Sequence, residues 1–348
     1  MFYVKNVSAD GIYSVYESEC DNLYREMTLD ELRKFSNQDG IFVAGVSKKR
    51  VTPYNCIEDY CRFVQARAKL LNSELEIGSW GRTPLLSVIR ASGNRKTSIP
   101  EGVSNISSYA YQCCILDEHL EIPKSVEKIE LCAFNDTNIV SVKIPDSVEI
   151  LGNYAFSDCK KLETVHLGKY TNMLGQRCFA HSGLKSVEIP LSTTSIGVSC
   201  FEGCASLEAI TLSENLTHLG NACFAECVSL KSIKIPGGIQ ELENNMFYGC
   251  ESLESVEFSE GLEIIDFECF SSCSSLTSIV FPETLRTIDW GVFNDCVSLR
   301  EVYLPKSLKE ISPNFQLGKK GDIIFKVYRG SYASSFCESS YLNFKYLD

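Results

Sequence analysis

The chain has 348 residues, 44% of them hydrophobic, and a formal net charge of −12 at pH 7. The charge is uneven, because residues 1–98 carry 14 Lys and Arg against 12 Asp and Glu, whereas residues 99–348 carry 19 against 33. Nucleic acids and anionic membranes require clustered basic residues, so neither is expected as a partner of the acidic part. No run of about 18 apolar residues occurs, so no membrane insertion is predicted.

The N-terminus begins Met1-Phe2-Tyr3-Val4-Lys5 and lacks a basic region followed by an apolar run. Such a start is not typical of a secretion signal. The expected location is therefore cytoplasmic. The alternative is a cell-surface or secreted protein from which the signal has been removed.

Residues 1–96 predict a small α+β module. Strand-like residues at 3–4 and 12–15 lie on either side of an Asp-Gly pair at 10–11, which favours a hairpin turn. Thr28 and Glu31 form a capping box, which predicts a helix through about residue 35.

The second half of this module predicts a short strand at 41–46 and a helix at 57–71, where apolar residues recur on one face. Residues 92–96 have the polar composition of a junction. A solenoid end exposes apolar surface and needs a cap, so one interpretation of the module is a cap. The other interpretation is an independent binding module.

From Ile99 onward the sequence repeats every 22 or 23 residues. The repeat is aligned on the residue that follows a short apolar pair: Pro100, Pro123, Pro145, Gly168, Pro190, Ser213, Pro236, Ser259, Pro282 and Pro305. Self-similarity at this period predicts a solenoid with one structural unit per turn. Solenoids typically present extended binding surfaces.

Each unit contains a strand and a turn. Val256 and Phe258 lie on either side of polar Glu257, and this alternation predicts a strand with one buried face. A proline after most of these strands ends the hydrogen-bonded ladder, because proline has no N–H to donate. The segment around Met246 and Phe247 predicts a turn or short helix whose phenylalanine fills the interior.

The unit resembles the BspA-type leucine-rich repeat over residues 97–316, and the tail at 325–333 is similar to the segment that closes such arrays. One copy consists of Ile144-Pro145-Asp146-Ser147-Val148, Leu151, Ala155-Phe156, Cys159, Leu162, Val165 and Leu167. The resemblance implies a right-handed solenoid with a sheet on one side. It also implies a role like that of bacterial surface proteins, which bind other proteins or host matrix.

The predicted fold class is therefore α+β with two parts. Residues 1–96 form the N-terminal module or cap. Residues 97–348 form a leucine-rich repeat solenoid of about ten repeats, closed by a C-terminal cap at about 317–348.

Seventeen cysteines occur, and most occupy two positions of the repeat. One position is occupied by Cys159, Cys204, Cys227, Cys250, Cys273 and Cys296. The other alternates between Cys and Ala, Met or Val, as a packing position would. We expect a column of buried free thiols, with disulfides or a metal site as alternatives.

No phosphate-binding, dinucleotide-binding, zinc-protease or nucleophile-elbow motif is present. The four histidines lie at different positions of the repeat, so they are not expected to form one site: His119, His166, His181 and His218. The chain is therefore predicted to be non-catalytic, with no cofactor and no metal.

The candidate binding residues lie between the two buried residues of successive strands and face outward. They are Lys143, His166, Glu188, Thr211, Lys234, Glu257, Val280 and Tyr303. This mixture of charge, polarity and one aromatic residue is typical of a protein-contact surface, with Tyr303 as a candidate anchor. Trp290 and Tyr248 are further candidates. An ordinary solvated sheet face is the alternative.

The predicted function is protein–protein recognition through this sheet face, and by resemblance one version of it is surface adhesion. The alternatives are an intracellular scaffold and a structural spacer that presents the N-terminal module. The partner and the oligomeric state are not predicted.

Overall fold

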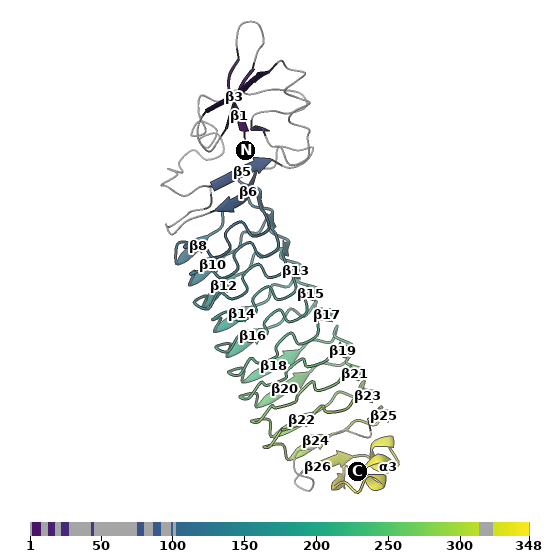
Figure 1. The fold of residues 1–348 in the computed structure, drawn as a ribbon. Coiled ribbons are helices and arrows are strands. Elements are labelled where there is room, and N and C mark those ends of the chain that lie inside the picture. The colour runs from purple at the N-terminus through teal and green to yellow at the C-terminus, as the bar shows by residue number, and fades with distance from the viewer. Residues whose placement is uncertain are drawn as a thin grey trace.

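In the computed structural model the chain forms a long rod of stacked turns (Figure 1). The structure describes Ile99, residues 102–312 and 323–347, together with the backbone of six strands before residue 92. Two rows of parallel strands run along the rod on different sides, and α3 lies at its C-terminal end (Figure 1).

The first row, called the long-strand row, consists mainly of the strands predicted from the alternating pattern. Its members are β8 (His119–Glu121), β10 (Ser141–Lys143), β12 (Thr164–His166), β14 (Ser186–Glu188), β16 (Ala209–Thr211), β18 (Ser232–Ile235), β20 (Ser255–Phe258), β22 (Ser278–Val280), β24 (Glu301–Tyr303), β26 (Ile324–Val327) and β27 (Phe344–Tyr346). Strands β10 to β24 are those predicted from the pattern, whereas β8, β26 and β27 were not predicted. Strands β8 to β20 form one hydrogen-bonded sheet and β22 to β27 another.

The second row, called the short-strand row, consists of two-residue strands. Its members are β7 (Asn105–Ile106), β9 (Lys128–Ile129), β11 (Ile150–Leu151), β13 (Met173–Leu174), β15 (Ser195–Ile196), β17 (His218–Leu219), β19 (Glu241–Leu242), β21 (Ile264–Ile265), β23 (Thr287–Ile288) and β25 (Glu310–Ile311). Its ladder is interrupted between β17 and β19. The resemblance implied a sheet on one side only, and the pairing of these short strands on a second side was not predicted.

A column of stacked aromatic rings fills the interior. It consists of Tyr111, Phe134, Phe156, Phe179, Phe201, Phe224, Phe247, Phe270 and Phe293, all fully buried. Successive ring centroids lie 5.1 to 5.9 Å apart and the rings are nearly parallel, an offset-stacked geometry that aromatic pairs favour. The predicted phenylalanine plug of each turn is therefore correct.

Tyr111 begins the aromatic column, and its buried hydroxyl has no hydrogen-bond partner in the described part of the chain. An unpaired buried hydroxyl costs about 1–3 kcal/mol. We therefore expect Tyr111→Phe to raise the free energy of unfolding by about 1 kcal/mol, measured by urea denaturation. Tyr328→Phe, outside the column, serves as the control. A loss of stability in Tyr111→Phe would contradict this account.

The turn that holds each phenylalanine is built from left-handed residues and contains no helix. In each unit two residues four positions apart have positive φ, as in Arg177 (φ 50°) and His181 (φ 56°). Their N–H groups donate to carbonyls of the following turn, at Val198 (2.9 Å) and Glu202 (2.7 Å). These bonds link neighbouring turns on the side of the rod that has no long strand, which offsets the cost of the left-handed conformation.

The six N-terminal strands are β1 (Phe2–Val7), β2 (Tyr13–Glu17), β3 (Asn22–Met27), β4 (Val43–Ala44), β5 (Leu75–Ser79) and β6 (Leu86–Ala91). Antiparallel pairing of β1 with β2 confirms the predicted hairpin, and β4 lies within the expected strand at 41–46. Strand β6 pairs with β7, so the short-strand row continues before residue 92.

The expected helices at 28–35 and 57–71 and the junction at 92–96 lie outside the described residues. The α+β class is not confirmed, because α3 (Tyr332–Ser339) is the one helix in the part of the chain that the structure describes. The boundary between residues 96 and 97 stays a prediction.

The C-terminal end is covered by α3 and β27. Ser331 is the N-cap of this helix, and its hydroxyl oxygen accepts a hydrogen bond from the N–H of Ser334 (3.1 Å). Ala333 and Cys337 on this helix are fully buried in the same core as the last turns. The final apolar surface of the described solenoid is thus removed from water.

Candidate binding face

The eight candidate residues, called the outer column, lie side by side on the long-strand row. Lys143 is in register with His166, Glu188 with Thr211, Lys234 with Glu257 and Val280 with Tyr303. Seven of the eight are exposed. On each strand the residues before and after the outer-column residue point into the core. Successive side chains of a strand point to opposite faces, so the outer-column residue points into solvent.

Tyr303 differs from the other seven because it is half-buried. Its hydroxyl donates a hydrogen bond to Glu301 (2.9 Å), and Lys326 lies 5.8 Å from the ring centroid. The side chain is held by its own neighbours, so its predicted role as an anchor for a partner is not supported by this geometry. Val280, the aliphatic member of the outer column, is 59% exposed and is therefore accessible to a partner.

The lysines of this face are paired with carboxylates. The ion pairs are Lys143–Glu121 (3.6 Å), Lys185–Glu163 (2.6 Å), Lys231–Glu208 (2.7 Å) and Lys234–Glu214 (2.9 Å). In the described ranges no ion pair involves Glu188, Glu254 or Glu257. Glu254 and Glu257 also attract Lys231 and Lys234, but each of these lysines is already in an ion pair, so carboxylates exceed lysines on this face.

A second outward column precedes the outer column by two residues and consists mainly of small hydroxyl side chains. This hydroxyl column contains Ser141, Thr164, Ser186, Ala209, Ser232, Ser255 and Ser278. Sequence reasoning missed it, although its spacing is that of the repeat. Small side chains beside long ones leave a depression along the strands.

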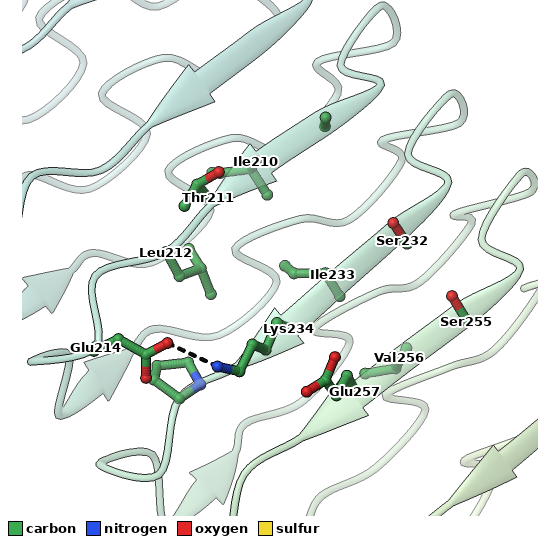
Figure 2. A pocket seen from close by; sticks show the side chains of 12 residues that line it. Ile210, Thr211, Leu212, Glu214, Ser232, Ile233, Lys234, Ser255, Val256 and Glu257 are labelled. Carbon is green, nitrogen blue, oxygen red and sulfur yellow. Dashed lines mark hydrogen bonds and ion pairs between the residues drawn. The ribbon is translucent and has the colours of Figure 1, made fainter.

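A hollow of about 600 Å³ opens over β16, β18 and β20 (Figure 2). Ala209, Ser232 and Ser255 contribute short side chains to it. Figure 2 shows the Lys234–Glu214 ion pair on one side of the hollow and Glu257 on the neighbouring strand. The hollow is open to solvent, so an extended peptide of another molecule could lie across it.

The cysteines form the buried column that the sequence predicted. Of the 14 described cysteines all are free thiols and 12 are buried, while Cys113 is exposed and Cys132 half-buried. Burial raises the pKa of Cys159 and of Cys204 to about 11 and that of Cys250 to about 12. These thiols stay protonated and lack the thiolate that nucleophilic chemistry needs.

One cysteine position has a role beyond packing. Its thiols donate to the carbonyl of the phenylalanine one turn earlier, as in Cys227 to Phe201 (3.2 Å) and Cys273 to Phe247 (3.2 Å). Thr137 and Ser182 occupy the same position, and each hydroxyl contacts the thiol of the next turn, at 3.2 and 3.3 Å. These members all make polar contacts between turns, which sequence reasoning overlooked by treating cysteine as a small apolar residue.

The four histidines lie at separate repeat positions, as expected. His119 contacts the hydroxyl of Ser141 (2.9 Å), and His218 lies 3.7 Å from Glu243. Among Ile99 and residues 102–312 and 323–347, no group of three or more His, Cys, Asp or Glu side chains is placed to hold a metal ion. No helix in those ranges is long and apolar enough to cross a membrane.

Trp290 and Tyr248, the other candidates, lie in the turns and are partly exposed. Trp290 packs on Phe267, with ring centroids 4.5 Å apart. Neither residue belongs to the long-strand row, so the structure separates them from the outer column.

Near Trp290, the short-strand row carries a cluster of carboxylates. Partial burial, a hydrogen bond with Glu241 and the charges of Asp289 and Glu243 raise the pKa of Asp266 to about 7. In an unfolded chain this pKa is about 3.9. Between these values the folded protein holds a proton that the unfolded chain lacks, so this group favours folding at low pH, and the benefit is lost as pH rises through 7.

We expect Asp266→Asn to flatten the decline in stability between pH 5 and pH 8. The side chain is only half-buried, so solvent screening limits the effect to about 1 kcal/mol. Urea denaturation at both pH values measures it, with Glu310→Gln on the same row as the control. An unchanged slope in Asp266→Asn would show that the carboxyl is ionised throughout.

Comparison with known families gives one clear result. The family model for the BspA type leucine-rich repeat region matches residues 91–208 and 194–317, in six copies. This span is most of the described solenoid. No curated protein sequence matches the chain.

Several solved structures are similar. A leucine-rich repeat protein from Bacteroides ovatus is 21% identical, covers 81% of this chain and 100% of its own, and has a TM-score of 0.39. The pneumococcal vaccine antigen PcpA is 16% identical over 81% of this chain and 98% of its own, at 0.48. The T. pallidum leucine-rich repeat protein is 22% identical over 61% and 90%, at 0.46.

Proposed function

Because the chain belongs to the BspA-type leucine-rich repeat family, we propose that it is a non-catalytic binding protein that recognises a protein partner through its long-strand row. The observation that carries the proposal is the exposed, register-aligned face of β8 to β20. Seven members of the outer column are in solvent, and the small hydroxyl column beside them leaves room for a partner.

The interior supports a non-catalytic role. Its aromatic column and protonated thiols supply packing and internal hydrogen bonds. Solenoids of this kind present repeated side chains over a long surface, which suits recognition of another macromolecule. Surface adhesion is one form of this function.

The test is a four-residue charge reversal on the face: Lys143→Glu, Glu188→Lys, Lys234→Glu and Glu257→Lys. A control variant reverses two lysines and two glutamates on the other side of the rod: Glu127→Lys, Lys128→Glu, Lys309→Glu and Glu310→Lys. Both variants keep the net charge. Both should melt within about 3 °C of the wild type, because exposed charges contribute little to stability.

The readout is quantitative affinity capture from the source cells. We expect the face variant to lose the captured protein and the control variant to retain it. Equal capture by both variants overturns the proposal and favours a structural spacer that presents the N-terminal module. Crosslinking of the captured protein to a photoreactive residue at Thr211 locates the contact on the face.

The compartment is a separate proposal. Twelve buried free thiols suit a reducing environment such as the cytoplasm. Protease treatment of intact source cells, followed by a blot, tests this. Protection until lysis supports an intracellular scaffold, whereas cleavage on intact cells supports adhesion.

A further inference from the structure

We propose that the occupant of the long-strand row is a basic, extended segment of the partner, seated in the hollow over β16, β18 and β20. This inference rests on the proposed function and names the chemistry of the partner. Three observations carry it: the charge left on the face, the spacing of the carboxylates that lack an ion pair, and the short side chains on the floor of the hollow.

The charge around the hollow is negative after internal pairing. Strands β14 to β20 and their flanks present five carboxylates and three lysines: Glu188, Glu208, Glu214, Glu254 and Glu257, with Lys185, Lys231 and Lys234. Glu163, before β12, is the ion-pair partner of Lys185. Each lysine is within 2.9 Å of a glutamate of the face. The remaining carboxylates attract a cation, and an acidic partner would be repelled.

The spacing of the free carboxylates matches an extended chain. Glu257 and Glu254 lie on either side of Ser255, so both border the hydroxyl column on β20. Glu188 lies on β14, three strands away in the same sheet. Neighbouring strands are about 4.8 Å apart, which places Glu188 about 14 Å from Glu257 along the rod. About four residues of an extended peptide cover that length.

The floor of the hollow suits a backbone. Ala209 is in register with Ser232, and Ser232 with Ser255, so three short side chains lie in line across the strands. The two serine hydroxyls can both donate and accept hydrogen bonds, as a peptide backbone requires. A peptide that crosses the strands can therefore lie on this floor while its Lys or Arg side chains reach the carboxylates.

The probe is a fluorescent peptide of ten residues that alternates arginine and serine, with an acidic peptide of equal length for comparison. Fluorescence anisotropy at 20 mM and 200 mM salt measures binding to the full chain. We expect the basic peptide to bind at low salt and to weaken as salt rises. The acidic peptide should not bind. Equal binding of both peptides, or none of the basic one, overturns the inference.

The matched variants neutralise three carboxylates each. The face variant carries Glu188→Gln, Glu254→Gln and Glu257→Gln, and the control carries Glu127→Gln, Glu226→Gln and Glu310→Gln. We expect the face variant to bind the basic peptide about tenfold more weakly and the control to change it less than about twofold. Equal weakening in both variants would show attraction by net charge alone and would overturn the inference.

Capture of the cellular partner by the four-residue reversal and by the neutralised face variant separates this inference from the proposed function. If the cellular partner is lost in the four-residue reversal but bound normally by the neutralised face variant, recognition uses the face without a basic segment, and only the inference fails. If neither set affects capture, the proposed function fails as well. Loss of the partner in both sets, with the controls intact, supports both.

Discussion

Replacing Phe224 with alanine is expected to lower the free energy of unfolding by about 3–5 kcal/mol, the cost of truncating a fully buried phenylalanine. Phe224 stacks between Phe201 (5.7 Å) and Phe247 (5.6 Å) at the middle of the aromatic column. Both contacts would be lost, and each aromatic pair contributes about 0.5–1.5 kcal/mol beyond its buried area.

The mode of unfolding is expected to change as well. A solenoid is stabilised by contacts between neighbouring turns, so one weak interface divides it into two units. Urea denaturation of Phe224→Ala should show two transitions where the wild type shows one. Phe258→Ala is the matched control, because Phe258 is half-buried and lies outside the column. A loss in Phe224→Ala no larger than in the control would mean that the stack contributes only ordinary burial.

Replacing Gly220 with alanine is expected to cost about 3 kcal/mol. A Cβ atom at this position would lie 2.5 Å from the backbone nitrogen of Val198 and 2.8 Å from the backbone carbon of Gly197. Backbone atoms of a packed turn cannot move aside as a side chain can, so the added methyl group strains two turns. The loss is measured by urea denaturation.

The control for Gly220→Ala is Asn221→Ala, the next residue, which should change stability by less than about 0.5 kcal/mol. If Gly220→Ala lowers the free energy of unfolding by equally little, the neighbouring turn accommodates the added methyl group and the prediction is wrong. The chain offers a natural comparison, because Glu243 occupies the equivalent position one turn later. The ladder of the short-strand row is interrupted at that place, between β17 and β19. A side chain at this position does not by itself break the row, because Glu130 and Asp266 occupy it where β9 with β11 and β21 with β23 remain paired.

The sequence predicted the fold to the level of individual buried positions. Phe134, Phe156 and their equivalents were expected inside, and all are fully buried. The outer column was expected in one line, and register pairs such as Lys234 with Glu257 confirm that arrangement. These predictions hold because each unit is copied in the next turn, so a period in the sequence becomes a line in space.

Side-chain chemistry was predicted less well. The role of Ser182 in the cysteine column depends on the thiol of Cys204, 22 residues away in the chain, and a hydrophobicity pattern does not report a hydrogen bond. The half-burial of Tyr303 involves Lys326, which lies in register with it on the neighbouring strand β26. Both features arise between turns, where sequence distance does not indicate contact.

The sequence by itself therefore determined the repeat, its buried skeleton and the line of outward residues, because these follow from local periodicity. Only the tertiary structure decided which carboxylates remain unpaired, where Ala209, Ser232 and Ser255 align into a hollow, and how Asp266 acquires its raised pKa. Those properties depend on distances across the stacked turns, since electrostatic and packing energies are set by neighbours in space.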